Sequence, residues 1–180
     1  PSPLTPLPIQ YADYALWQRD RLTGEVLSKQ LDYWREQLTD VPALDLPTDR
    51  ARPPVQTYNG AVYHDHLPEK LISQLKELSQ SQGATLFMTM MAALQVLLSR
   101  YTHQEDIAVG SPVAGRTLPE IENLIGFFVN TLVYRGDLSG NPSFVDFLQQ
   151  TRDRCMEAYT YQEVPFEKLV EEIKPVRDMS

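Results

Sequence analysis

The chain has 180 residues, of which 42% are hydrophobic and 22% charged, a composition typical of a globular protein with one good core. Its formal net charge of −8 comes from 24 acidic residues and 16 basic ones scattered among them. Phosphate binding requires clustered Lys and Arg, so the charge argues against a nucleic-acid partner. The single cysteine, Cys155, excludes an internal disulfide and is consistent with a reducing cytoplasm.

The sequence predicts no membrane association. Its most apolar window, 84–98, is interrupted by Thr85, Thr89 and Gln95 and is shorter than the ~20 residues of a membrane span. The N-terminus carries prolines at positions 1, 3, 6 and 8 instead of the basic and apolar regions of a secretory signal. This composition is typical of an extended linker, so we expect the chain to continue from an upstream segment.

The first half of the chain begins with two predicted helices. One runs from Ile9 to a break at Gly24, and the second carries Leu27, Leu31, Trp34 and Leu38 on one face. The aromatic residues in 11–17 are more often core than a ligand site. After a Pro-rich segment, 40–54, alternation predicts a solvated or edge strand over Gly60–Leu67. His64 and His66 share one face of it, without the acidic or cysteine partner of a metal site.

Two more helices and a strand follow. Pro68 starts a helix that Gly83 ends, and Thr85 is the predicted N-cap of the next helix. The wide apolar face of that helix is predicted to be buried, and it consists of Leu86, Met90, Leu94, Leu97, Leu98 and Tyr101. A short strand, 106–109, then leads into a turn-rich loop, 110–116. Ser111 in this loop lacks the glycine two residues ahead of it that a nucleophile elbow needs, which argues against a serine hydrolase.

The stretch from Ile125 to Arg135 is predicted to be a buried strand, because apolar side chains fall on both of its alternating faces. Asn130 interrupts this apolar run. An unpaired buried Asn would cost ~1–3 kcal/mol, so its side chain must have partners. Two roles remain open for it: closing a hydrogen-bond gap at a bulge or strand end, or shaping a pocket.

The last third is predicted to be helical. A turn, 136–140, precedes a helix that Asn141 and Pro142 start. One face of this helix carries Phe144, Phe147, Leu148, Thr151, Cys155, Ala158 and Gln162. Cys155 therefore lies on the core side without a cationic neighbour, which argues against a nucleophilic thiolate. Pro165 opens a final helix with apolar residues at helical spacing.

Four stretches, in the right order, resemble the core motifs of nonribosomal peptide synthetase condensation domains. Residues 11–17 are similar to Tyr-x-Asp-Tyr-Ala-Val-Trp, with Leu16 in place of Val. Residues 126–135 resemble the motif with Gly, a hydrophobic pair, Val-Asn-Thr and a closing Arg. Residues 161–167 resemble His/Asn-Gln-Asp-Val/Tyr-Pro-Phe-Glu, from which Tyr161 and Glu163 depart. Residues 177–180 match the start of Arg-Asp-x-Ser-Arg-Asn-Pro-Leu.

This resemblance implies an α/β fold: a chloramphenicol-acetyltransferase-like lobe, with a mixed sheet flanked by helices, from a two-lobed domain. Residues 1–54 would be lobe-connecting helices and a Pro-rich crossing segment, and residues 55–180 a portion of the second lobe. The chain would then be a fragment, less than half of a complete domain. Its helices would expose apolar faces that absent strands cover, which implies marginal stability or association through those faces.

The resemblance also implies an enzyme activity, amide bond formation between two acyl groups that carrier proteins hold as thioesters. The family's catalytic motif, His-His-x-x-x-Asp-Gly, would lie upstream of Pro1, so the isolated segment is expected to be inactive. Asn130, Gly126 and Gln162 would support the active site. Arg116 or Arg135 would pair with the Asp of the upstream motif, and the alternative for either arginine is a plain surface position.

No metal and no directly bound cofactor is expected, because the substrates travel on the phosphopantetheine arms of carrier proteins. The implied partners are the donor and acceptor peptidyl carrier proteins and an adjacent adenylation domain, in cytoplasmic synthesis of antibiotics and other secondary metabolites. The sequence is equally compatible with a different class of function: a condensation-like module without chemistry that docks carrier proteins or a tailoring enzyme. Epimerising and heterocyclising relatives agree less well with the intact Val-Asn-Thr and Pro-Phe-Glu stretches.

Overall fold

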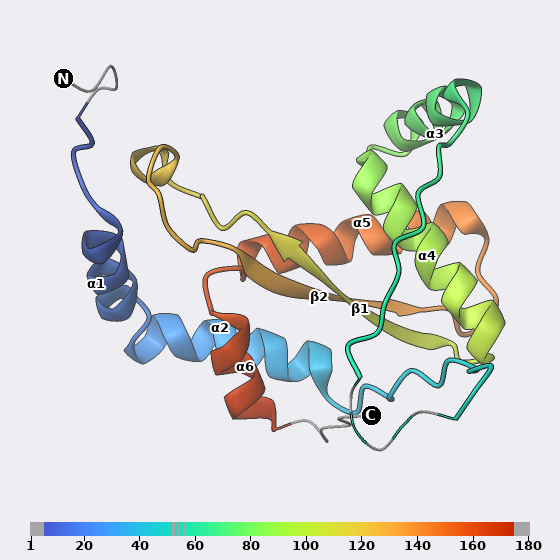
Figure 1. Ribbon diagram of the computed structural model, residues 1–180, viewed down its shortest axis with the longest axis horizontal. Helices are drawn as coiled ribbons and strands as arrows, with labels where there is room; N and C mark the ends of the chain where they lie inside the picture. The colour runs from blue at the N-terminus through green and yellow to red at the C-terminus, as the bar shows by residue number, and fades with distance from the viewer. Residues whose placement is uncertain (1–5, 52, 54, 56, 175–180) are drawn as a thin grey trace. The chain divides into compact units, whose positions relative to one another are not determined.

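The computed structural model of the chain describes residues 6–51, 53, 55 and 57–174 (Figure 1). Residues 177–180, which carry the fourth motif, lie outside this part. The helices are α1 (Tyr11–Arg21), α2 (Gly24–Leu38), α3 (Glu69–Ser81), α4 (Leu86–Thr102), α5 (Phe144–Thr160) and α6 (Phe166–Ile173). The strands are β1 (Asp106–Val113) and β2 (Asn130–Asp137), with a short 3-10 helix, η1 (Pro119–Ile121), between them.

The described residues form two compact units, and neither is a continuous stretch of chain. Unit 1 comprises residues 6–39, 110–133 and 158–174, and unit 2 comprises residues 40–109 and 134–157. Both units draw on segments far apart in the chain. The assignment of 1–54 and 55–180 to parts of two lobes stays a prediction.

The strands β1 and β2 form a two-stranded sheet, in which Figure 1 shows them running in opposite directions. The pairing continues past the strand ends, where the Leu138 N–H donates to the Glu105 carbonyl at 2.7 Å. Helices accompany this sheet in the described part of the chain, so the predicted α/β class is confirmed. The described sheet is a small part of the mixed sheet that the resemblance implies.

Unit 1 has its core where α2 packs against α6. Trp34 of α2 is 1% exposed, and its Nε1–H donates to the Tyr161 carbonyl at 2.9 Å. A second cluster consists of Ile121, Leu124 and Phe128. Burying large apolar side chains in this way contributes about 1.5–3 kcal/mol each, which makes these two clusters the main stabilising elements of the unit.

Unit 2 has its core between α4, α5 and the strand residues that belong to it. A Cβ on Gly136 of β2 would lie 2.8 Å from Phe147 Cζ and 2.9 Å from Gln95 Cδ, so both side chains pack closely on the strand. The Gln95 Nε2 donates to the carbonyls of Ile107 at 3.3 Å and Tyr134 at 3.0 Å. One α4 side chain therefore ties β1 to β2.

The buried face of α4 is not the one that the sequence predicted. Met90, Leu94, Leu97 and Tyr101 are between 40% and 62% exposed, whereas Met88, Thr89, Met91, Ala92 and Gln95 are buried. The prediction followed hydrophobicity alone. The Thr89 hydroxyl and the Gln95 Nε2 tolerate burial because they have hydrogen-bond partners, and the Thr89 hydroxyl lies 2.7 Å from the Ser79 hydroxyl.

The strand boundaries also differ from the prediction. The stretch predicted as a strand from Ile125 is a loop up to Val129, and β2 begins only at Asn130. Ile125 and Phe127 are 93% and 73% exposed, so the alternating apolar residues there are not buried on both sides. The strand β1 runs on to Val113 through part of the predicted loop. Gly60–Leu67 is exposed and has no strand partner among the described residues.

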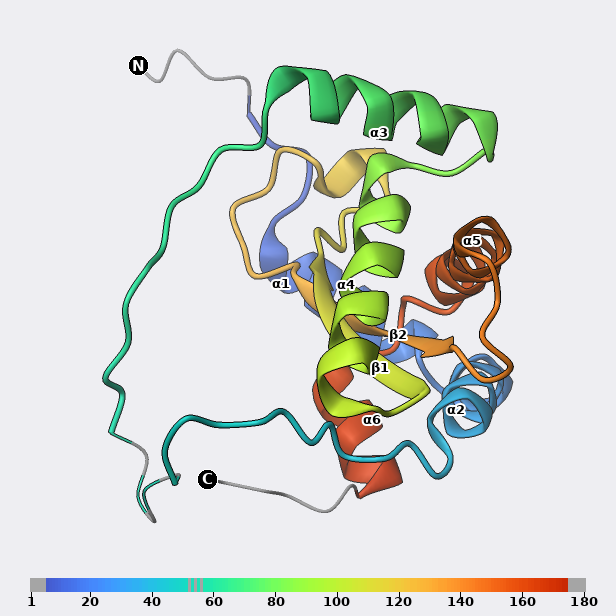
Figure 2. The same cartoon turned by 90° about the vertical axis from the view of Figure 1, so that its right-hand side faces the viewer.

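Gly24, the predicted break after the first helix, is the first residue of α2, because α1 already ends at Arg21. From α3 onward the helix boundaries follow the predicted start and stop signals, with one exception. The predicted roles of Pro68, Gly83, Thr85 and Pro165 are confirmed, and the Thr85 Oγ1 accepts the Met88 N–H at 3.3 Å. Figure 2 shows α3 and α4 joined by the short connection around Gly83. The exception is α5, which begins at Phe144 because the Ser143 Oγ accepts the Asp146 N–H at 3.2 Å and caps the helix there.

None of the helices in the described ranges is by itself long and apolar enough to cross a membrane, and α3 with α4 reaches that length only as a pair bent by 102°. The described residues also contain no group of three or more His, Cys, Asp or Glu side chains that could hold a metal ion. His64 and His66 are both exposed.

Cys155 lies on the buried side of α5, where its exposure is 0% and burial raises the pKa of its thiol from 9.0 to about 12. We expect a disulfide reagent such as DTNB to label it at pH ~8 only after unfolding. Between about pH 9 and 12 the folded state keeps a proton that the unfolded state releases, so stability falls as pH rises through this window.

Urea denaturation at pH ~8 and ~10 measures this effect, and Cys155→Ala serves as the reference because it removes the titrating thiol. Rapid labelling of the folded protein, or the same pH dependence in the alanine variant, would contradict the buried position of Cys155.

Candidate functional site

Asn130, the first residue of β2, forms four hydrogen bonds with its side-chain amide. Its Nδ2 donates to the carbonyls of Gln162 and Val164, each at 2.9 Å. Its Oδ1 accepts the N–H of Thr131 at 2.9 Å and the N–H of Phe166 at 3.0 Å. The amide thus closes the strand end and fastens the segment before α6 to β2.

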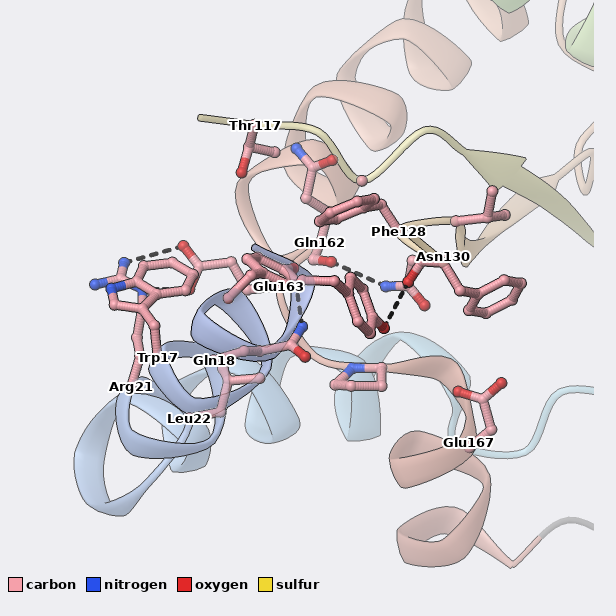
Figure 3. Close-up of a pocket in the computed structure, with 16 residues that line it drawn as sticks. Trp17, Gln18, Arg21, Leu22, Thr117, Phe128, Asn130, Gln162, Glu163 and Glu167 are labelled. Carbon is pink, nitrogen blue, oxygen red and sulfur yellow. Dashed lines mark hydrogen bonds and ion pairs between the residues drawn. The ribbon is translucent and has the colours of Figure 1, made fainter. Parts of the chain in front are cut away.

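A cleft of about 210 Å³ lies beside Asn130, and all of its walls belong to unit 1 (Figure 3). One wall is α1, whose Tyr11, Tyr14 and Trp17 have neighbouring ring centroids 6.1 and 5.8 Å apart. The other walls come from 115–130 and from 162–167, including Asn130 and Gln162. Asn130 therefore has both of the roles that the sequence left open, because it closes the end of β2 and also shapes the cleft.

Gly126 lies against the Tyr11 ring, where a Cβ would be 2.2 Å from the Tyr11 Cδ2. The Tyr11 hydroxyl donates to the neighbouring Phe127 carbonyl at 2.9 Å. The glycine of this motif is therefore a requirement for close packing on α1. Sequence reasoning missed this contact because it placed Gly126 inside a strand.

Arg116 is engaged within its own loop. Its guanidinium donates to the carbonyls of Ile121, Glu122 and Leu124, the last two at 3.1 and 2.9 Å. It also lies 4.2 Å from the centroid of the Phe128 ring, within the range of a cation–π contact. Arg116 thereby holds residues 116–124 against Phe128, and it is not among the residues that line the cleft.

Arg135 belongs to unit 2, where it forms a bidentate ion pair with Asp106. The Nε–Oδ1 and Nη2–Oδ2 distances are 2.8 and 2.6 Å, and the side chains are 27% and 31% exposed. The hydrogen bond to Asp106 raises the pKa of the Arg135 guanidinium further. The pairing of Arg116 or Arg135 with the Asp of an upstream motif stays a prediction.

The two positions that depart from the family motif both have partners in unit 1. The Tyr161 ring stacks on Tyr33 with centroids 4.1 Å apart and an interplanar angle of 10°. Glu163 accepts two hydrogen bonds from Arg21, at 2.7 and 3.0 Å. Figure 3 shows the two side chains pointing toward each other. Neither contact was predictable from the sequence, since the partners lie more than a hundred residues apart along it.

The lining of the cleft is suited to positioning a ligand. No His or Cys is among its lining residues, and the Glu163 carboxylate is occupied by Arg21. Burial raises the pKa of Tyr14 above 10.0, so this phenol stays neutral at physiological pH. The other polar and aromatic lining residues include aromatic rings and amides, which bind by packing and hydrogen bonding, and the Glu167 carboxylate.

Comparisons with known proteins agree with this arrangement. The family model of the Condensation domain matches residues 1–180. The chain is 57% identical over 180 residues to a linear gramicidin synthase from Brevibacillus parabrevis, covering 99% of this chain and 4% of that relative. It thus spans a small part of the curated relative's length.

Solved structures are also similar to this chain. The complex of the X-domain and OxyB from teicoplanin biosynthesis matches with a TM-score of 0.89 and 31% identity, over 98% of this chain and 40% of that chain. A four-domain nonribosomal peptide synthetase bound to AMP and glycine matches with a TM-score of 0.83 and 28% identity, over 88% and 12%. The motifs in 11–17, 126–130 and 161–167 surround one cleft, and the family model matches along all 180 residues. The chain therefore belongs to the condensation domain family.

Proposed function

We propose that the chain is part of a condensation domain that forms a peptide bond in nonribosomal peptide synthesis. The amine of an acceptor attacks the carbonyl carbon of a donor thioester, and the carrier thiol leaves. The observation that carries the proposal is the assembly of three family motifs around one cleft, in a chain 57% identical to a linear gramicidin synthase. Such a reaction needs two tethered substrates held in a fixed orientation.

Within this proposal the described residues position the substrates. Proton handling belongs to the second His of a His-His-x-x-x-Asp-Gly motif, which the 180 residues do not contain. Asn130, Gly126 and Gln162 support the active site by fixing the walls of the cleft. Arg116 or Arg135 pairs with the Asp of the motif.

The proposed partners are the donor and acceptor peptidyl carrier proteins and an adjacent adenylation domain, in the cytoplasm. The substrates arrive on phosphopantetheine, and the chain itself binds no cofactor and no metal. The four-domain synthetase among the structural relatives supports a multidomain setting.

The first test compares the isolated 180-residue polypeptide with a synthetase that carries it together with the His-His-x-x-x-Asp-Gly motif. Given loaded donor and acceptor carriers, the synthetase is expected to form a dipeptide, measured by mass spectrometry, and the isolated polypeptide none. A synthetase with the second His replaced by Ala is the control for uncatalysed transfer. Dipeptide formation by the isolated polypeptide would overturn this assignment of roles.

One observation favours a second function, a condensation-like module that binds a partner protein without chemistry. The TM-score of 0.89 is to an X-domain whose structure was solved in complex with OxyB. A synthetase that makes no dipeptide but still binds its carrier proteins in calorimetry would decide for this function.

A further inference from the structure

We propose that Arg21 and Glu163 are positioning residues that set the width of the cleft in unit 1. Both line the cleft, from opposite walls: Arg21 is the last residue of α1, and Glu163 lies in the segment before α6. Their bidentate ion pair joins the two walls directly. The inference rests on the proposed function, because it assigns the cleft a part in holding a substrate.

Polar contacts hold the helix α1 at its two ends, and between them Tyr14 packs on Phe128 with ring centroids 4.9 Å apart. None of its 11 residues is buried, so hydrophobic packing alone fixes it weakly. At its first residue the Tyr11 hydroxyl donates to Phe127, and at its last residue Arg21 binds Glu163. The position of the C-terminal end of this wall therefore depends on the ion pair.

The opposite wall is fixed independently. The carbonyls of Gln162 and Val164, on either side of Glu163, accept hydrogen bonds from Asn130. Glu163 is thus a rigid anchor, and breaking the ion pair releases α1 rather than the segment before α6. The Arg21 guanidinium also lies 5.6 Å from the centroid of the Trp17 ring, so its release changes the surroundings of Trp17.

The ion pair contributes little to the stability of the whole protein. The two side chains are 45% and 33% exposed, and exposed pairs of this kind have small effects on unfolding. Its loss therefore moves α1 without unfolding the protein. Salt screens exposed charges, so the effect of the pair must diminish as ionic strength rises.

The test measures KM and kcat of the synthetase with Glu163→Gln, varying the loaded donor and acceptor carriers in turn. We expect KM for one carrier to rise about threefold with kcat unchanged, because a loosened wall weakens binding only modestly. Glu163→Asp keeps the carboxylate and is expected to restore most of the affinity. The KM ratio of variant to wild type is expected to approach 1 in about 1 M NaCl.

The chain offers a matched control in the ion pair of Arg35 with Glu172, also in unit 1. Its side chains are 46% and 43% exposed, and neither lines the cleft. Glu172→Gln is expected to leave both KM values unchanged. An equal rise of KM in the two variants, or a fall of kcat alone, would overturn the positioning role.

A second readout does not depend on activity. Trp17 is 42% exposed and Trp34 is 1% exposed, and these are the two tryptophans of the 180 residues, so acrylamide quenching of the tryptophan fluorescence of this chain reports on Trp17. Glu163→Gln is expected to change this quenching and Glu172→Gln is not. Unchanged quenching in both variants refutes the inference. An inactive wild-type synthetase with altered quenching in Glu163→Gln refutes the proposed function and leaves the ion pair as the determinant of the α1 position.

Discussion

Replacing Asn130 with alanine is expected to lower the free energy of unfolding by about 3 kcal/mol. The amide serves two carbonyls and two N–H groups through bonds of 2.9 to 3.0 Å, and alanine leaves all four backbone groups without it. The cleft wall formed by residues 162–167 should loosen at the same time. Urea denaturation and amide hydrogen exchange of Gln162 to Phe166 measure the two effects.

The control for this substitution is Asn123→Ala, at an exposed asparagine of the same unit, which should change stability by less than about 0.5 kcal/mol. Asn130→Asp is a stricter test. It keeps the acceptor oxygen but turns a second oxygen toward the carbonyls of Gln162 and Val164, so at neutral pH it should be no more stable than alanine. A fully stable aspartate variant would show that the amide does not donate there.

Replacing Gly115 with alanine is expected to be as damaging, at about 3 kcal/mol or more. The added Cβ would lie 1.8 Å from the Phe128 carbonyl oxygen. Gly115 also has a φ of +65°, a backbone conformation that residues with a side chain rarely adopt. The clashing atom is backbone and cannot rotate away. Relief of the clash must displace Phe128 from the cluster with Ile121 and Leu124.

Gly140→Ala is the matched control for backbone strain. Gly140 has a φ of +72°, and a Cβ there would meet nothing within 4 Å. Its replacement should therefore cost only about 1–2 kcal/mol, the penalty of the left-handed conformation. Equal thermal stability of the two variants would show that the contact between Gly115 and Phe128 is unimportant.

The sequence predicts the helix ends well because their signals are local. Pro68, Thr85 and Pro165 act through their own backbone or through a side chain that reaches one turn along the helix. The orientation of α4 was not predictable in the same way. Burial of Gln95 depends on carbonyls of β1 and β2, which only the tertiary structure brings to it.

In the candidate site, too, local features were predictable from the sequence and tertiary contacts were not. The motif around Asn130 was recognisable, and its need for hydrogen-bond partners follows from the chemistry of an amide in an apolar run. The identity of those partners did not follow, nor did the bond between Arg21 and Glu163, which are 142 residues apart. The loop over 125–129 was mistaken for a strand because Tyr11 and Arg116, rather than a neighbouring strand, hold it.

The division of unit 1 among three chain segments has a consequence for synthesis on the ribosome. Trp34 finds its partner, the Tyr161 carbonyl, only 127 residues later in the chain. At roughly 5–20 residues per second, this delay lasts on the order of ten seconds. During that time the apolar face of α2 is exposed on the nascent chain, so a cotranslational chaperone is expected to engage it until residues 158–174 emerge and close the unit.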